Sequence, residues 1–251
     1  MKNMVSIITA TFNSSNEIEL TYNSILNQTH TNWEWIVTDD CSTDDTYNIL
    51  QNIQRNDERV KIFKNLVNLG AAVSRNNSLS YVQGDYISFI DSDDLWYEDK
   101  LKLQINFMLT NKVDFSFTAY ELIDQNGSKL FKEVDRNIDR PVNYNDMLKK
   151  YATIGCSTVM LRRLAFDDLS MPLLRTGQDY ATWLKLLKTG INAYPICYVL
   201  TQYRILPNSI SRNKFKKALR QWQIYRVLEK LSLFKSLYCF FCYGFRALFR
   251  K

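Results

Sequence analysis

The sequence has one histidine among its 251 residues and only seven glycines. His30 lies in a polar stretch between a predicted helix and a predicted strand, so histidine triads, histidine metal sites and histidine acid–base pairs are not expected. No glycine-rich phosphate loop of the Walker or the dinucleotide type is present. Phosphate transfer from ATP and hydride transfer from a dinucleotide therefore lack their usual sequence support.

Closely spaced cysteines and long hydrophobic runs are also scarce. Of the five cysteines only Cys239 and Cys242 are near one another, so neither a disulfide framework nor a zinc site is predicted, and a reducing, cytoplasmic compartment is expected. The apolar run at residues 5–10 is too short for a signal peptide and has no cleavage site after it, so export is not expected. The length favours one large domain, or one domain with a small appendage.

The charge of the chain is unevenly distributed. Residues 212–251 contain eleven Lys or Arg residues and a single acid, Glu229, whereas residues 1–211 contain 21 basic and 25 acidic residues. This argues against a nucleic-acid partner for the main domain. In the tail, Lys235 and Arg246 leave ten residues between charges, about half a membrane span. We expect a basic, aromatic helix in the headgroup region of an anionic membrane, with a helix packed on the domain as the alternative.

Strand and helix patterns alternate over the first hundred residues. Strands are predicted at 5–10, 33–37, 60–63 and 85–90, with helices between them, and a helix follows at 98–109. This pattern predicts an α/β fold: a mostly parallel sheet with helices on both faces, which binds ligands at the carboxyl ends of its strands. Later strands are predicted at 113–120, 157–161 and 193–200, and a helix begins near Gly177. The expected organisation is a main domain, 1–211, with a nucleotide-binding half (1–110) and an acceptor-binding half (111–211), and a membrane-associating tail, 212–251.

Carboxylates follow two strands of the predicted sheet. Asp39 and Asp40 end one apolar strand, where helix capping does not require them, and Asp91 and Asp93 end another. Two carboxylates two residues apart on an extended segment can hold a hard divalent cation together with phosphate oxygens. Because carboxylates repel a nucleotide diphosphate, we expect Mn²⁺ or Mg²⁺ to bridge them and to stabilise the departing diphosphate.

Several motifs in a fixed order resemble the inverting nucleotide-sugar glycosyltransferases of family 2, which have the GT-A (Rossmann-like) fold. The segments, which fall within residues 4–211, are VSIITATFN at 5–13, VTDDCSTD at 37–44, Asn68-Leu69-Gly70 with Arg75-Asn76, FIDSDDLW at 89–96 and GQDY at 177–180. Cys41 replaces a glycine that is usual in the second motif. The resemblance is to members of the bacterial O-antigen and polysaccharide type.

The resemblance implies roles on the nucleotide-sugar side of the site. Phe12 and Asp40 would contact the base, and Arg75 would hold the diphosphate. Asp91 would bind the ribose and the metal, with Asp93 the more direct metal ligand. The segments at Thr11 and Asp39 would complete the nucleotide-sugar site.

The resemblance also implies roles on the acceptor side. Asp179 would be the catalytic base, placed to deprotonate an acceptor hydroxyl opposite the departing nucleotide diphosphate. Without the resemblance, Asp179 reads equally as a first-turn acid that complements the helix dipole. Asp94 and Gln178 would shape the acceptor side, although Gln178 stands where glutamate is usual. Leu206 stands where many members have histidine.

These roles predict a metal-dependent, inverting transferase that moves glucose or galactose from a UDP-sugar. The resemblance, together with the basic tail, implies a β-linked product, β-1,3, on GlcNAc- or GalNAc-diphospho-undecaprenol in O-antigen repeat synthesis at the cytoplasmic face of the bacterial inner membrane. Alternatives are a catalytically silent nucleotide-binding membrane scaffold and a transferase acting on a capsule or another polysaccharide. A nucleotidyltransferase would need a glycine-rich loop after the first strand, and residues 9–16 contain no glycine.

Overall fold

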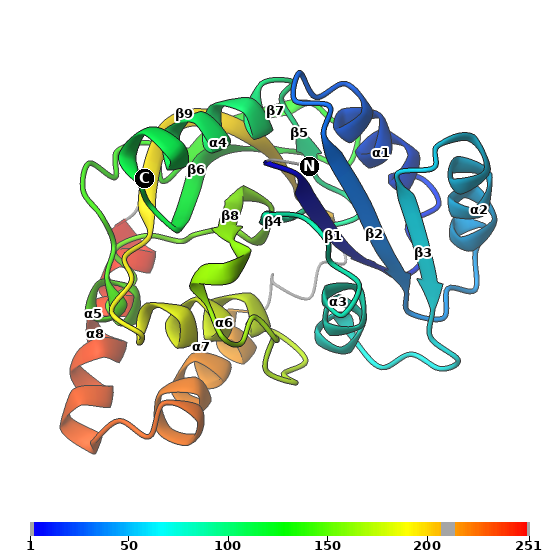
Figure 1. Ribbon diagram of the computed structural model, residues 1–251. Helices are drawn as coiled ribbons and strands as arrows, with labels where there is room; N and C mark the ends of the chain where they lie inside the picture. Colours follow the sequence, from blue (N-terminus) through cyan, green and yellow to red (C-terminus); the bar gives the residue numbers. More distant parts are fainter. Residues whose placement is uncertain (1–2, 207–213, 250–251) are drawn as a thin grey trace.

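The computed structural model describes residues 3–206 and 214–249, which form one sheet covered by helices (Figure 1). The strand order is β3-β2-β1-β4-β8-β6-β9-β5, and β7 pairs with β6. The first half comprises, in chain order, β1 (Val5–Thr11), α1 (Ile18–Leu26), β2 (Trp33–Asp39), α2 (Thr46–Asn56), β3 (Val60–Lys64), α3 (Ala71–Leu79) and β4 (Tyr86–Phe89). The predicted alternation of strands and helices is therefore confirmed there.

The first four strands are parallel, with β1 between β2 and β4. All seven residues of β2 are buried, as expected for a strand covered on both faces. The chain adds β2 and β3 on one side of β1 and then crosses to add β4 on the other. This reversal creates a topological switch point at β1, where ligands of such sheets bind.

The second half adds antiparallel pairings to the sheet. It contains β5 (Leu95–Trp96), α4 (Lys100–Asn111), β6 (Phe115–Ile123), β7 (Lys129–Val134), α5 (Tyr144–Leu148), β8 (Val159–Arg162), α6 (Gln178–Leu187) and β9 (Tyr194–Arg204). β8 is antiparallel to both β4 and β6, whereas β9 is parallel to β6. The strand predicted at 157–161 begins later, because Cys156–Thr158 form a short 3-10 turn.

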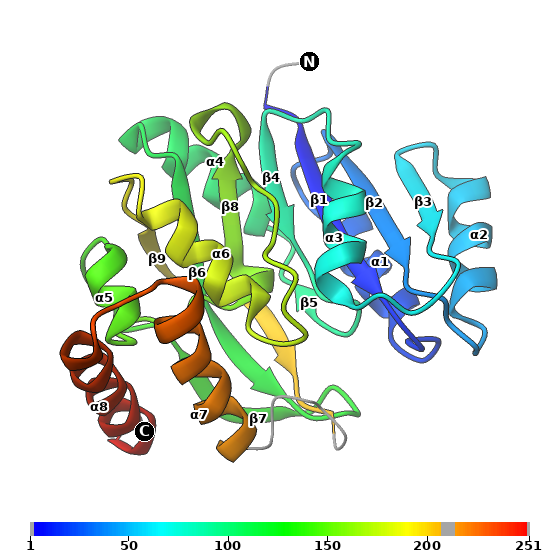
Figure 2. The same cartoon turned by 90° about the horizontal axis from the view of Figure 1, so that it is seen from below.

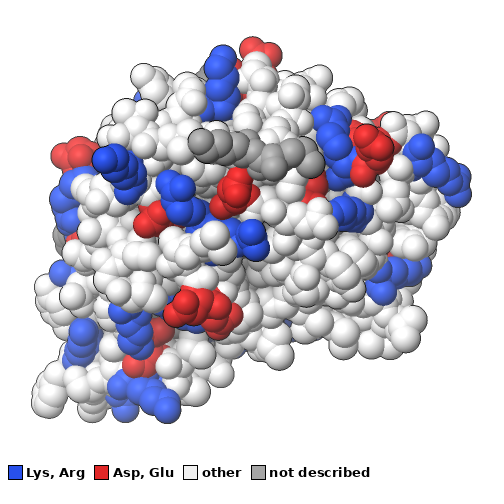
Figure 3. Space-filling view, in the orientation of Figure 1, with Lys and Arg blue, Asp and Glu red and all other residues white. Residues whose placement is uncertain are grey.

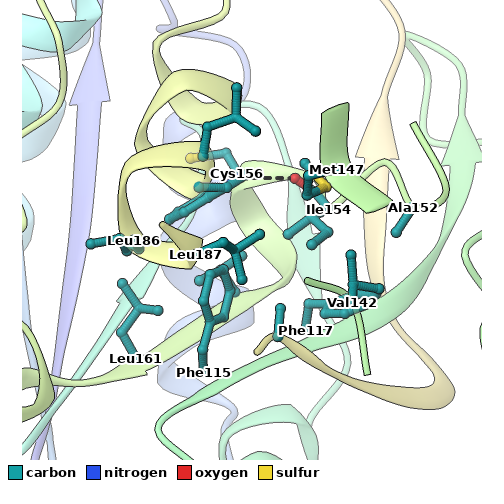
Figure 4. Close-up of a cluster of buried hydrophobic side chains, with 14 of the residues drawn as sticks. Phe115, Phe117, Val142, Met147, Ala152, Ile154, Cys156, Leu161, Leu186 and Leu187 are labelled. Atoms are coloured by element: carbon teal, nitrogen blue, oxygen red, sulfur yellow. Dashed lines mark hydrogen bonds between the residues drawn. The ribbon is translucent and has the colours of Figure 1, made fainter. Parts of the chain in front are cut away.

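Two layers of helices cover the sheet (Figure 2). Ile7 of β1 packs with residues of α1, α2 and α4 in one hydrophobic cluster, whereas its neighbour Ile8 packs with residues of α3, α5 and α6 in the other. The alternation of side chains along the strand accounts for this division. Figure 4 shows part of the second cluster, where Phe115 and Phe117 of β6 meet Leu186 and Leu187 of α6.

The tail helices pack on the domain. They are α7 (Lys214–Gln223), a π-helical turn (Ile224–Leu228) and α8 (Leu233–Phe249). Ile224, Tyr225 and Cys239 belong to the same cluster as Trp183 of α6. The alternative prediction, a helix packed on the domain, is therefore confirmed for the side of the tail that carries these residues. No helix among residues 3–206 and 214–249 has the length and hydropathy to cross a membrane.

Candidate active site

The candidate site lies at the carboxyl ends of β1, β2 and β4. Thr11 and Asp39 are register partners at the ends of β1 and β2. Thr11 Oγ1 and Asp39 Oδ1 are both buried, and neither has a hydrogen-bond partner in the described part of the chain. The second oxygen, Asp39 Oδ2, accepts a hydrogen bond from the Ser42 amide at 3.1 Å. Since an unsatisfied buried polar atom costs about 1–3 kcal/mol, this pair is suited to a ligand that offers both a donor and an acceptor.

Asp40 organises the loop between β3 and α3. Its Oδ1 accepts hydrogen bonds from Asn65 Nδ2 at 2.8 Å and from the Leu69 amide at 2.9 Å, and its Oδ2 accepts one from the Gly70 amide at 2.7 Å. Gly70 has a φ of 91°, a conformation that glycine adopts without strain. Both carboxylate oxygens of Asp40 thus bind protein donors. Phe12, which is 47% exposed, lies at the end of β1, and the contacts of both residues with a base stay predictions.

Cys41 adopts a left-handed backbone conformation with a φ of 65°, which explains why glycine is usual at this position. A non-glycine residue there costs roughly 1–2 kcal/mol. The Cys41 thiol makes only a weak contact, 3.5 Å from the Leu66 carbonyl oxygen.

We expect Cys41→Gly to raise the free energy of unfolding by about 1 kcal/mol, measured by urea denaturation. Cys197→Ala, at an exposed thiol in β9, is the control, and equal stability of Cys41→Gly and wild type would contradict the prediction.

Arg75 joins α3 to the segment after β4. Its Nη2 lies 2.5 Å from Asp91 Oδ1, and its buried Nε and Nη1 have no hydrogen-bond partner in the described residues. Burial opposes the charged guanidinium, but the charges around it, Asp91 and Asp179 among them, keep its pKa above the ordinary arginine value. Two donors of a buried cation thus remain for an anionic ligand.

Asp91 and Asp93 fit a divalent cation as oxygen donors. Burial, and secondly the charge of Asp91, raise the pKa of Asp93 to about 7. A bound cation would relieve this crowding, because it favours both ionised carboxylates. The described residues contain no group of three or more His, Cys, Asp or Glu side chains placed to hold a metal, so phosphate and water oxygens would have to complete the coordination.

Asp94 is buried and connects the segment after β4 with the 3-10 turn at Cys156–Thr158 and with the end of β9. Its Oδ2 accepts a hydrogen bond from Ser157 Oγ at 2.5 Å, and its Oδ1 accepts one from the Arg204 amide at 2.9 Å. The Arg204 side chain in turn donates from Nε to the Asp93 carbonyl oxygen at 2.7 Å. The strand predicted at 193–200 ends before Arg204, and the sequence pattern gives this residue no role. The predicted acceptor-side role of Asp94 would act through the shape that these contacts give to residues 91–94.

Asp179 lies in the first turn of α6, after Gly177, whose φ is 72°. Burial raises the pKa of the Asp179 carboxyl group, although the Tyr180 amide and the charge of Arg75 act in the opposite direction. The charges of Arg75 and Asp91 both act on the pKa of Asp179, so this carboxyl group lies within electrostatic reach of their ion pair. The neighbouring Gln178 has its Oε1 buried without a partner in the described residues.

Known proteins resemble the chain both in sequence and in fold. Residues 6–170 match the family described as Glycosyl transferase family 2. The chain is 44% identical to TuaG of Bacillus subtilis (strain 168), named as a teichuronic acid biosynthesis glycosyltransferase, over 100% of this chain and 98% of that protein. It is 39% identical to WfgD of Escherichia coli, over 88% of this chain and 85% of that protein. WfgD is named UDP-Glc:alpha-D-GlcNAc-diphosphoundecaprenol beta-1,3-glucosyltransferase.

A crystal structure of S. aureus TarS 1-349 in complex with UDP-GlcNAc superposes with a TM-score of 0.73 at 21% identity. The match covers 91% of this chain and 65% of that one. The fold, with its carboxylates at the switch point of the sheet, is therefore that of the GT-A glycosyltransferases. The chain belongs to glycosyl transferase family 2, as its motifs predict, and it is a glycosyltransferase.

Proposed function

We propose that the protein is a metal-dependent, inverting transferase that moves a hexose from a UDP-sugar to a sugar on a diphospho-undecaprenol lipid. The observation that carries the proposal is the ion pair of Arg75 with Asp91, at 2.5 Å, which lies within electrostatic reach of Asp179 on a third segment. It combines an anion-binding cation, a metal-ligand candidate and a carboxylate of raised pKa. A metal-assisted inverting transfer from a nucleotide diphosphate sugar uses these three features.

The uracil ring fits the unsatisfied pair at the strand ends. Uracil has an imide N–H beside carbonyl oxygens, so it can donate to Asp39 Oδ1 and accept from Thr11 Oγ1. A cytosine ring has no N–H at that position and could donate to Asp39 Oδ1 only from its exocyclic amino group. Phe12 is exposed beside this pair and offers an aromatic surface for stacking. These features favour a uridine nucleotide as the donor.

Asp91 and Asp93 would hold the divalent ion, Mn²⁺ or Mg²⁺, with the diphosphate. When bound, the ion supplies positive charge to the leaving diphosphate. Arg75 provides the remaining positive charge from its unpartnered Nε and Nη1. Asp179 would accept the proton of the acceptor hydroxyl, which then attacks the anomeric carbon opposite the diphosphate. Because no covalent intermediate forms, an α-linked donor gives a β-linked product.

The relatives favour particular substrates. WfgD and WfaP of Escherichia coli are each named as beta-1,3-glucosyltransferases for UDP-Glc and a GlcNAc-diphosphoundecaprenol, at 39% identity. We therefore infer β-1,3 transfer of glucose or galactose onto a GlcNAc- or GalNAc-diphospho-undecaprenol, as in O-antigen repeat synthesis. This would occur at the cytoplasmic face of a bacterial inner membrane, with residues 212–251 on the anionic surface. The similarity to TuaG favours a second candidate, a transferase for another envelope polysaccharide.

The test is transfer from a panel of radiolabelled UDP-sugars to GlcNAc- and GalNAc-diphospho-lipid analogues, with Mn²⁺ or with EDTA. We expect one sugar to be transferred in a β-linkage with Mn²⁺, and EDTA to reduce the rate at least a hundredfold, since the ion stabilises the leaving group. Heat-denatured protein is the control. Binding of UDP without transfer to any acceptor would contradict the proposal and favour the silent scaffold. Transfer that persists in EDTA would contradict the metal requirement.

A further inference from the structure

The outward side of α8 carries a continuous row of apolar side chains, which we call the outer stripe. Its residues recur at intervals of three or four, so they share one side of the helix. Their exposed fractions range from 51% to 85%, and the members are Phe234, Leu237, Tyr238, Phe241 and Phe245. A row of solvent-exposed apolar side chains of this length marks a site of interaction.

The opposite side of α8 is fixed to the domain. Ser236, Cys239 and Tyr243 are buried there, and Cys239 belongs to the core cluster that contains Trp183. The helix therefore cannot turn to bury the outer stripe without removing these residues from the core. Figures 1 and 2 show α8 at the edge of the molecule, beside α5 and α7.

The charge around the outer stripe is positive. The exposed basic residues in the described part of the tail include Lys216, Lys217, Lys230 and Lys235, and the one acid of the tail, Glu229, is paired with Lys188 at 2.7 Å. Lys235 lies on α8 about 100° around the helix from Phe234, at the edge of the stripe, with its Nζ 5.9 Å from the centroid of the Tyr144 ring. In Figure 3, basic side chains lie over the tail helices beside uncharged surface. Apolar side chains flanked by basic ones suit a layer of anionic headgroups over hydrocarbon.

We propose that the outer stripe of α8 docks on an anionic lipid bilayer, with the basic residues of the tail at the level of the headgroups. The charge complementarity selects this partner over a second copy of the chain, because two apolar stripes brought together would also bring their basic flanking residues together. This assigns the membrane contact of the proposed function to one face of one helix. Its biological purpose rests on that proposed function.

α7 and the π-helical turn that follows it, which lead into α8, also contact the residues just before α6, the helix that carries Asp179. Arg220 Nε of α7 lies 3.3 Å from Thr176 Oγ1, and a Cβ atom on Gly177 would lie 3.4 Å from Ile224 Cδ1. Residues 176 and 177 come directly before α6. A bilayer held by α8 would therefore have a fixed position relative to Asp179, as transfer to a lipid-borne acceptor requires.

The experiment is co-sedimentation of the full chain with vesicles of phosphatidylglycerol and phosphatidylcholine, compared with phosphatidylcholine alone. We expect wild type to bind the anionic vesicles, and Phe234→Ser with Phe241→Ser to weaken binding roughly tenfold or more, because two large apolar contacts are lost. Lys230→Gln with Lys235→Gln should weaken binding to anionic vesicles by a similar factor. Leu164→Ser, at a leucine that is 83% exposed after β8, is the matched control and should bind as wild type does.

Unchanged vesicle binding by the Phe234→Ser, Phe241→Ser protein would overturn the proposal. So would a wild-type dimer that this variant converts to a monomer in light scattering, if vesicles are not bound, because the stripe would then join two copies. Circular dichroism checks that each variant is folded. The vesicles contain neither sugar nucleotide nor acceptor, so failure here is distinguishable from failure of the proposed transfer reaction.

Discussion

Asp179→Asn is expected to lower kcat by a factor of roughly 10²–10⁴, the usual contribution of a general base. Asparagine keeps the size of the side chain but cannot take a proton from the acceptor hydroxyl. The change should leave UDP binding nearly intact, because Arg75 and Asp91 remain. Radiolabelled transfer and UDP titration by calorimetry measure the two effects separately.

The pH dependence of the rate gives a second readout of Asp179. Burial raises the pKa of this carboxyl group above its ordinary value, and the base works only when it is ionised. The wild-type rate should therefore fall as the pH drops through the raised pKa and level off above it. Asp168→Asn is the control, since Asp168 is exposed and pairs with Lys185 at 2.9 Å, away from the site. If Asp179→Asn retains full activity, the base lies elsewhere.

The nucleotide half of the fold could be predicted from sequence because its strands are covered on both faces. Burial on both faces accounts for the apolar residues Trp33, Trp35, Ile36 and Val37 of β2, and the carboxylates at the ends of β2 and β4 are then assigned to one edge of the sheet. β7 could not be predicted, since its residues are nearly all exposed and it has no hydrophobic alternation. β5 has two residues and α5 has five, too few for a period to be recognised.

The candidate site could be predicted only to the level of which residues gather there. The pattern places Asp39 and Asp40 together at one strand end, yet Asp40 binds the loop at 65–70 while Asp39 keeps an unsatisfied oxygen. Arg204 was missed because it reaches the Asp93 backbone across 111 positions of the sequence. No local pattern encodes a contact between a side chain and a distant carbonyl group.

α4 carries a fully buried lysine, Lys100. Its replacement should change the free energy of unfolding more than replacement of an exposed lysine on the same helix. Lys100 Nζ donates to Ser88 Oγ at 3.0 Å and lies 3.9 Å from the centroid of the Trp96 ring. It forms no ion pair with any carboxylate in the described residues. Burial without a counter-charge holds the pKa of Lys100 well below that of a free lysine. The amine is therefore much easier to deprotonate in the folded protein than in the unfolded chain.

The sign of the pH effect follows from this difference. Between the lowered folded pKa and the unfolded value of about 10.4, unfolding takes up a proton at Lys100, so the free energy of unfolding rises with pH across that window. Lys100→Met removes the proton uptake and keeps an apolar side chain of similar length against Trp96. We expect it to stabilise the protein by about 1–3 kcal/mol at pH 7, the usual cost of a poorly satisfied buried polar group.

Urea denaturation of wild type and Lys100→Met at pH 6, 7.5 and 9 checks both parts of this expectation. The gain should be largest at pH 6 and should shrink toward pH 9, because the unfolded lysine then approaches its own pKa. Lys102→Met is the control on the same helix, since Lys102 is exposed and lies 3.8 Å from Asp99 in a weak surface pair. A gain that does not vary with pH would mean that Lys100 keeps its proton in both the folded and the unfolded state, and would contradict the lowered pKa.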